Sequence, residues 1–199
     1  MRLYGLWGYG VMGLYGLCYY ISVLQAKHKC IKLMKELSVT TIVKECSYDE
    51  LSEVDRALVD TAKEMTRNSY APYSRFHVGA AILLADGRIV AGANQENAAS
   101  PSGMCAERSA CFQAGAIAPG VAFEKIAVAA WTMLRKPEGL AYSHYFQSSP
   151  ISPCGACRQA LLEYEVRGGK PVEVILYGRE RCYIFPSIAS LLPYSFTEF

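Results

Sequence analysis

Residues 77–93, HVGAAILLADGRIVAGA, place two short apolar runs on either side of Asp86 and Gly87. An Asp-Gly pair favours a tight hairpin turn, because glycine adopts a positive φ without steric cost. The runs are rich in small and β-branched side chains, which is typical of buried strands. The stretch therefore predicts a β-hairpin whose strands cover residues 77–84 and 88–93.

Strand and helix patterns alternate outward from this hairpin. Upstream, residues 47–50, SYDE, have the form of a capping box, and apolar residues then recur at helical spacing over residues 48–67. Downstream, the patterns predict helices at residues 104–115, 154–164 and 187–192 and strands at residues 125–131, 172–177 and 182–185. Strands that alternate with helices indicate an α/β sandwich around one sheet.

The composition fits one folded domain, since the 199 residues are 52% hydrophobic and 19% charged. The net charge of +2 hides an uneven distribution, because four of the 20 basic residues and none of the 18 acidic residues precede Met34. The remaining 16 basic residues stand against 18 acidic ones. This part of the chain lacks the basic surface of a nucleic-acid binder, so we expect no nucleic-acid partner.

The first 33 residues differ from the rest of the chain. Residues 3–26 carry no charge and are rich in glycine, tyrosine and leucine. This run is long enough to span a bilayer, but it makes a poor secretory signal. It is either a membrane anchor that leaves the rest in the cytoplasm, or upstream sequence translated ahead of a true start at Met34. We therefore divide the chain into residues 1–33 and a domain over residues 34–199, and a membrane is a partner only in the first case.

Two motifs that carry thiols point to a metal site. Residues 101–108, PSGMCAER, offer Cys105 and, two residues later, Glu107, while residues 152–159, SPCGACRQ, offer Cys154 and Cys157. Three thiolates leave a tetrahedral Zn²⁺ with one open position, as a catalytic zinc site requires. A water in that position has its pKa lowered to about 7. We therefore predict that the three cysteines bind Zn²⁺ and that Glu107 carries protons beside it.

The charge of the thiolates and the place of the motifs in the chain both affect the zinc prediction. Both motifs lie at predicted helix starts, where the helix dipole lowers a thiol pKa. Three thiolates and Zn²⁺ leave one excess negative charge, and Arg108 and Arg158 are the nearest residues that can offset it, with Arg108 favoured. A thioredoxin-like pair is an alternative, but it follows the first strand of a βαβ unit. A structural zinc site is another, but it needs a fourth Cys or His nearby.

Five cysteines remain outside the two motifs, and we expect them to be free thiols. Their spacings do not form a disulfide framework, and a reducing compartment suits them and the metal site alike. They are Cys18, Cys30, Cys46, Cys111 and Cys182.

The motifs together resemble the small cytidine deaminase family over about residues 48–196. The matching stretches, in order, are residues 71–81 (APYSRFHVGAA), 94–98 (NQENA), 105–108 (CAER) and 152–159 (SPCGACRQ). A non-ligand Glu between a first zinc ligand and a later P-C-x-x-C is the known pattern of zinc nucleobase deaminases. Cysteine in place of histidine as the first ligand resembles the compact three-cysteine branch, whose members are homotetramers with active sites at subunit junctions.

This resemblance implies a fold, a reaction and a place. The fold is a three-layer α-β-α sandwich with a mixed central sheet of about five strands. The reaction is the zinc-dependent hydrolysis of cytidine and 2′-deoxycytidine to uridine and 2′-deoxyuridine with release of ammonia. It belongs to pyrimidine salvage in the cytoplasm.

The resemblance also implies roles for residues at the reacting base. One zinc ion per subunit is held by Cys105, Cys154 and Cys157. Glu107 takes a proton from the water, passes it to ring N3 and later protonates the leaving ammonia. The backbone amide of Ala106 holds the base carbonyl.

Further residues are implied at the rest of the nucleoside. The backbone carbonyl of Ser152 holds the leaving amino group, and Phe76 stacks on the pyrimidine. Asn94 and Glu96 hydrogen-bond the ribose 3′-hydroxyl, which ribonucleosides and deoxyribonucleosides share. Phe196 closes the pocket.

Three features depart from the family pattern. Ser100 stands where an aromatic residue usually reaches a neighbouring subunit, and residues 1–33 have no counterpart. Residues 132–149 are longer than the usual link, and their aromatic, irregular sequence predicts a surface excursion. The alternatives are a deaminase of a cytosine-containing antibiotic of the blasticidin kind, a silent zinc scaffold and a polynucleotide editor. The Asn94 and Glu96 pair favours ribose, the intact Glu107 opposes a scaffold, and the acidic domain opposes an editor.

Overall fold

A mixed β-sheet forms the centre of the computed structural model, which describes residues 35–133 and 141–197. The described elements lie in one compact unit that begins at Thr40. The two alternatives for residues 1–33 fall outside the described residues. Within the described ranges, no helix is long and apolar enough to cross a membrane.

Six strands make up this sheet in the described part of the chain, in the order β1-β6-β5-β4-β2-β3. All neighbours are antiparallel except β4 and β5, which run parallel, so the prediction of a mixed sheet is confirmed. The strands are β1 Lys44–Cys46, β2 Phe76–Leu84, β3 Ile89–Ala93, β4 Phe123–Thr132, β5 Glu173–Tyr177 and β6 Cys182–Phe185.

The sheet has one strand more than predicted, namely β1. It is three residues long and pairs with β6 at the sheet edge. Lys44 and Glu45 are exposed, so the strand shows neither an apolar run nor a buried face that sequence periodicity could reveal.

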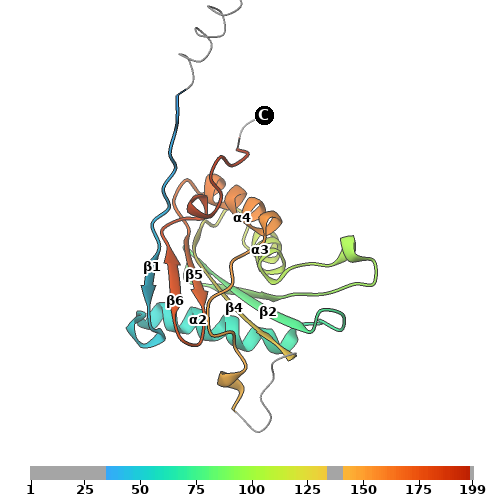
Figure 1. The fold of residues 1–199 in the computed structure, drawn as a ribbon. Helices are drawn as coiled ribbons and strands as arrows, with labels where there is room; N and C mark the ends of the chain where they lie inside the picture. Colours follow the sequence, from blue (N-terminus) through green and yellow to red (C-terminus); the bar gives the residue numbers. More distant parts are fainter. Residues whose placement is uncertain (1–34, 134–140, 198–199) are drawn as a thin grey trace, which may run out of the picture. The chain divides into compact units, whose positions relative to one another are not determined.

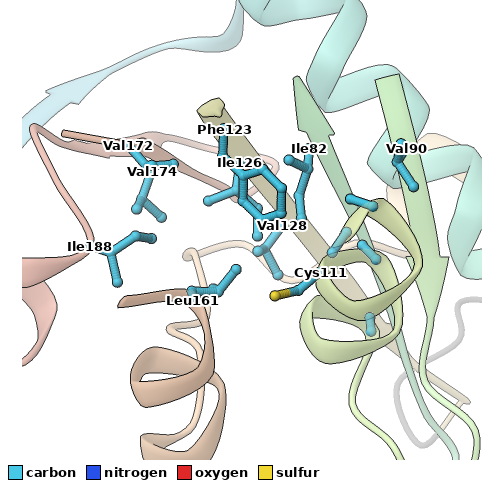
Figure 2. Close-up of a cluster of buried hydrophobic side chains, with 14 of the residues drawn as sticks. Ile82, Val90, Cys111, Phe123, Ile126, Val128, Leu161, Val172, Val174 and Ile188 are labelled. Atoms are coloured by element: carbon cyan, nitrogen blue, oxygen red, sulfur yellow. The ribbon is translucent and has the colours of Figure 1, made fainter. Parts of the chain in front are cut away.

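Helices cover both faces of the sheet, which confirms the predicted three-layer sandwich (Figure 1). Helix α2, Glu53–Met65, lies on one face, and helices α3, Ala106–Ile117, and α4, Gly155–Gly168, lie together on the other. Along β2, β3, β4, β5 and β6, side chains alternate between two cores. In β2, Ile82 belongs to the core under α3 and α4, shown in Figure 2, whereas Ala81 belongs to the core under α2.

The start of the first helix differs from its prediction. The capping box forms, since Glu50 accepts a hydrogen bond from Ser47 N at 2.7 Å, but it caps only a 3₁₀ turn, η1, at Tyr48–Glu50. Leu51 is buried in the α2-side core with an extended backbone (ψ 149°), which interrupts the helix. Helix α2 then starts after a second cap, where Ser52 Oγ accepts from Asp55 N at 3.1 Å.

The predicted hairpin is confirmed, with Gly87 in its turn at φ 86° and Leu83 paired with Ile89. A second glycine, Gly92 in β3, lets α3 lie against the sheet. A Cβ at this position would overlap Ala110 N and lie 2.8 Å from Ala106 O. Both are backbone atoms, so they cannot move aside as a flexible side chain can.

Gly92→Ala is expected to destabilise the protein by about 1–3 kcal/mol, because the added methyl group forces α3 away from β3. Urea unfolding of the wild type and the variant measures the difference. Gly155→Ala is the matched control, since a Cβ at Gly155 would meet no atom within 4 Å. Equal stabilities of the Gly92 and Gly155 variants would contradict the close approach.

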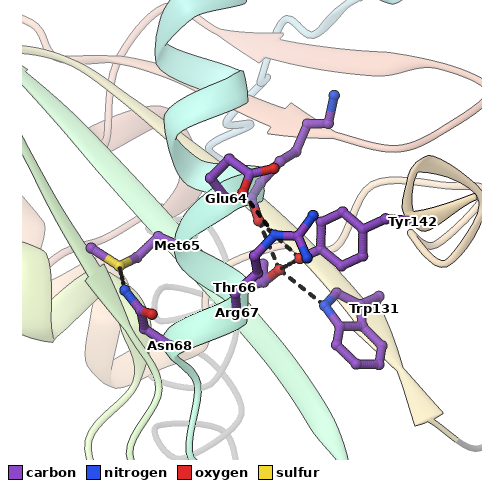
Figure 3. A network of polar contacts seen from close by, with 8 residues as sticks. Glu64, Met65, Thr66, Arg67, Asn68, Trp131 and Tyr142 are labelled. Atoms are coloured by element: carbon purple, nitrogen blue, oxygen red, sulfur yellow. Dashed lines mark hydrogen bonds and ion pairs between the residues drawn. The ribbon is translucent and has the colours of Figure 1, made fainter.

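The long segment over residues 132–149 was predicted to be a surface excursion, yet its described half packs on the α2 side of the sheet. Phe146 is buried and bridges to Trp131 in β4. Tyr142 Oη hydrogen-bonds Thr66 Oγ1, which also accepts from Trp131 Nε1 at 2.9 Å (Figure 3). Arg67 lies over the Tyr142 ring at 3.7 Å. The fully buried Thr66 thus joins the segment to the end of α2 and to β4.

Thr66→Val is expected to lower the free energy of unfolding by about 1–3 kcal/mol, because valine keeps the shape but leaves the buried Trp131 N–H without its acceptor. Chemical unfolding followed by tryptophan fluorescence measures the loss. Thr61→Val on the same helix is the control, since Thr61 Oγ1 donates only to Ala57 O in its own helix. A Thr66 variant as stable as the Thr61 variant would contradict the assigned role.

Candidate metal centre and active site

Three cysteine side chains meet where two helices begin. Cys105 is the N-cap of α3, Cys154 is the N-cap of α4, and Cys157 lies in the first turn of α4. Because α3 and α4 are neighbours in one layer, their N-terminal ends bring the thiols together. We call these three residues the cysteine cluster.

The sulfur atoms of the cysteine cluster have the spacing of metal ligands. The Sγ atoms of Cys105 and Cys154 are 4.0 Å apart, and those of Cys154 and Cys157 are 3.4 Å apart. All three lie within 4.8 Å of one another. Zn–S bonds of about 2.3 Å in a tetrahedral site place sulfurs roughly 3.8 Å apart. The donor set and its spacing therefore fit a zinc ion.

Hydrogen bonding within the cluster favours a thiolate. A hydrogen bond from the Cys157 thiol holds the pKa of Cys105 at about 5, and the Arg108 guanidinium lowers it as well. The same pairing, together with burial, raises the pKa of Cys157. Arg108 Nη2 lies 4.0 Å from Cys105 Sγ, and Arg108 Nε is buried without a hydrogen-bond partner among the described residues. Arg108 thus sits where it can balance thiolate charge.

Glu107 is a buried carboxyl group next to the cluster. It is the second residue of α3, two positions after Cys105, and only 4% of its surface is exposed. Burial raises its pKa above the usual range for glutamate. Ala106, between them, is the first helical residue, so its N–H has no partner within the helix and can donate to a ligand.

A pocket of about 450 Å³ opens beside the cluster, which is a size typical of small-molecule sites. Its lining brings the first predicted metal ligand together with both predicted sugar-binding residues. Cys105, Arg108, Asn94, Glu96 and Ser100 are among the residues that line it.

Asn94 also braces the start of β2. Its Oδ1 accepts hydrogen bonds from Val78 N at 2.8 Å and Ser69 Oγ at 2.5 Å, while its Nδ2 donates to Phe76 O at 2.9 Å. One Nδ2 hydrogen remains for a ligand. The sequence did not reveal this bracing role, because nothing in the spacing of these residues marks it.

Glu96 also supports the protein's own backbone, in the loop that contains Tyr73 and Ser74. Its Oε2 accepts from Tyr73 N at 2.9 Å and from Ser74 N at 3.2 Å. Tyr73 and Ser74 line the same pocket, although sequence reasoning had not singled them out as site residues. Hydrogen bonds from Ser74 lower the pKa of Glu96, which keeps this carboxylate charged.

Four predicted substrate-binding residues do not line this pocket, and Ala106 is one of them. Glu107, Cys154 and Cys157 do not line it either. Phe76 is half-buried at the start of β2, and Ser152 is exposed with its Oγ accepting from Arg158 Nη2 at 2.9 Å. Phe196 is 65% exposed, and its carbonyl oxygen accepts from Gln159 Nε2 at 2.8 Å. Their roles toward a substrate stay predictions.

Comparison with known proteins agrees with this site. A family model described as the cytidine and deoxycytidylate deaminase zinc-binding region matches residues 52–169, which include the whole cysteine cluster. A cytidine deaminase of Sporosarcina psychrophila is 39% identical over 142 residues, covering 71% of this chain and 90% of the relative. A probable cytidine deaminase of Dictyostelium discoideum is 31% identical over 140 residues, covering 70% and 82%.

Solved structures show the same similarity. The crystal structure of cytidine deaminase from Burkholderia pseudomallei is 37% identical, with a TM-score of 0.58 over 73% of this chain and 100% of that one. The cytidine deaminase from Mycobacterium tuberculosis is 30% identical, with a TM-score of 0.53 over 71% and 96%. The similarity thus covers nearly the full length of both solved chains.

Proposed function

This chain belongs to the cytidine deaminase family, and from that premise we propose that it hydrolyses cytidine and 2′-deoxycytidine to uridine and 2′-deoxyuridine. Water replaces the amino group at C4, and ammonia leaves. The chain is an enzyme that deaminates cytidine, with zinc as its cofactor, as the sequence predicted. The observation that best supports this reaction at this site is the cysteine cluster with the buried Glu107 at its side.

The chain's own residues divide the work at the base. When bound by the cysteine cluster, zinc activates a water for attack by lowering its pKa. Glu107 takes one proton from the attacking water and passes it to ring N3. It then delivers a second proton, from the hydroxyl group added at C4, to the leaving nitrogen. The Ala106 N–H orients the base carbonyl, and the Ser152 carbonyl accepts from the leaving amino group. Arg108 offsets the thiolate charge at Cys105.

The sugar end of the pocket supports a nucleoside rather than a free base or a modified sugar. Asn94 retains one N–H that bonds to no described residue, and Glu96 is a charged acceptor, so the pair offers a donor and an acceptor to one hydroxyl. A 3′-hydroxyl is common to cytidine and 2′-deoxycytidine, which supports turnover of both. Such a reaction serves pyrimidine salvage in the cytoplasm.

We also propose that the enzyme works as a homotetramer. Large apolar side chains stay exposed on the helix layer that carries the site, namely Phe112 and Ile117 in α3 and Val166 in α4. Ser100 lines the pocket in place of a larger aromatic residue, so subunit coupling should be weak. Sedimentation at several concentrations tests this, because a tight tetramer at all concentrations would contradict weak coupling.

An absorbance assay tests the proposed reaction. Cytidine, 2′-deoxycytidine and cytosine are supplied to protein whose zinc content is measured by mass. Both nucleosides should be deaminated, while cytosine, which lacks the sugar, should react poorly. A zinc-loaded protein that turns over neither nucleoside would refute the proposal. Turnover of cytosine as fast as cytidine would refute the role of Asn94 and Glu96.

A further inference from the structure

The chain that leads into the second pair of thiols has few contacts of its own. In the described part of the chain, residues 150–153 belong to no helix or strand and make no backbone–backbone hydrogen bond. The chain just ahead of Cys105 is better held, because Met104 and Gln95 exchange two backbone hydrogen bonds of 2.8 Å there. The place of Cys154 therefore depends on packing and on side chains.

One side chain supplies the hydrogen bonds that this loop lacks. Arg158 Nε donates to Pro153 O at 2.8 Å, and Nη2 donates to Ser152 Oγ at 2.9 Å. The backbone N–H of Arg158 donates to Cys154 O at 3.0 Å. Arg158 thus contacts three consecutive residues, the last of which is the thiol residue. A planar guanidinium fixes direction as well as distance, because its donors form a rigid fork.

The same guanidinium reaches the C-terminal segment. Arg158 Nη1 donates to Leu191 O at 2.7 Å, and Leu191 is buried in the core under α3 and α4. The fork is therefore braced on its far side by a residue that the core holds in place. The neighbouring Gln159 adds the separate bond to Phe196 O, which does not involve the loop.

The two arginines near the cluster act on different atoms. Arg108 lies against the sulfur of Cys105, whereas the Arg158 guanidinium donates, among the described residues, to three uncharged oxygens. Among the described residues, no ion pair within 4.0 Å involves Arg158. Arg158 therefore does not offset the thiolate charge by hydrogen-bonding a sulfur, which was the role that the sequence allowed for it.

We propose that Arg158 is a positioning residue that holds the loop before Cys154, and so sets where the second pair of thiols meets zinc. The inference rests on the proposed function, because that function requires a zinc ion at the cysteine cluster. Partners that orient metal ligands typically contribute about 10- to 100-fold to metal affinity. The Ser152 carbonyl, proposed to receive the leaving amino group, lies in the same loop.

Zinc release tests the proposal without relying on turnover. Arg158→Gln and Arg158→Lys are expected to release zinc to a chromogenic chelator about 10- to 100-fold faster than the wild type. Lysine keeps the charge but lacks the fork, so the Lys variant should stay impaired. Cobalt-substituted protein should show an altered visible spectrum in both variants, because that spectrum reports ligand geometry. Unfolding curves establish that the variants are folded during the measurement.

Two controls separate the loop from the rest of the helix. Arg167→Gln removes an arginine from the other end of α4, where it lies over the Tyr164 ring at 4.9 Å. Gln159→Ala removes only the bond to the C-terminal segment. Both should release zinc and give the cobalt spectrum as the wild type does.

Several outcomes would overturn the proposal. Zinc release at the wild-type rate in Arg158→Gln would do so, as would full rescue by lysine, since charge would then suffice. If neither Arg158 variant folds, the residue serves folding and the proposal is wrong. A wild type that binds zinc without deaminating cytidine would refute the proposed function alone, because the release comparison still decides the role of Arg158. A wild type that cannot bind zinc would refute both.

Discussion

Glu107→Gln is expected to lower turnover of cytidine by about 10²- to 10⁴-fold or more, while zinc content and fold stay unchanged. Glutamine has nearly the same shape, so the buried site by the cysteine cluster keeps its packing. An amide cannot take up and return a proton at neutral pH, and the reaction needs one proton at N3 and another at the leaving nitrogen. Steady-state kinetics, with zinc measured on the same sample, gives the result.

Glu163→Gln is the matched control for this variant. Glu163 lies in α4 with its side chain exposed, so the same chemical change there should leave turnover unaffected. Near-wild-type activity of Glu107→Gln would refute the proton-carrier role. Loss of zinc in Glu107→Gln, but not in Glu163→Gln, would assign Glu107 to support of the metal site instead.

The large elements of the fold were predictable because their local patterns agree with their tertiary setting. The continuous runs of small and branched residues on either side of Asp86 and Gly87 match a hairpin whose two faces are both buried. Strand β1 was missed because its pairing with β6, and not its own sequence, makes it a strand. The start of α2 was misplaced because Leu51 joins the core, which no capping pattern encodes.

The chemistry of the site was easier to predict than its scaffold. Cys105, Cys154 and Cys157 follow from residue type and spacing, since helix starts and C-x-x-C spacing bring thiols together. The hydrogen bonds that hold the site in place were harder to predict, because each joins residues far apart in the chain. Asn94 holds Phe76, and Arg158 holds Leu191, through contacts that depend on how strands and loops fold back. Single-sequence patterns report short-range periodicity and therefore miss such pairs.

The packing of residues 132–149 is another feature that sequence patterns did not reveal. The irregular sequence of this segment predicts a surface excursion. In the described part, Phe146 is buried in the α2-side core, and the half-buried Tyr142 and Tyr145 pack against that core. The Tyr142 ring contacts the rings of both Tyr145 and Phe146. Burial of aromatic side chains in an irregular segment leaves no periodic signal.

Cys157→Ser is expected to abolish stable zinc binding and with it the deamination of cytidine. The Cys157 thiol is fully buried in the first turn of α4, and serine is a poor substitute for a thiolate ligand. Two thiols cannot hold the ion as three do, so affinity should fall by more than the roughly 10- to 100-fold typical of an outer-shell partner. Metal analysis after dialysis against a chelator measures the loss.

Cys111→Ala separates loss of a ligand from loss of a buried thiol. Cys111 is as fully buried as Cys157 and lies in α3, but it is not part of the cysteine cluster. Its replacement should destabilise the core by roughly 0.5–3 kcal/mol while zinc stays bound. If Cys157→Ser kept its zinc, or if Cys111→Ala lost it, the ligand assignment would be wrong. Zinc should also raise the unfolding midpoint of the wild type and of Cys111→Ala, but not of Cys157→Ser, because only a bound ligand stabilises the folded state.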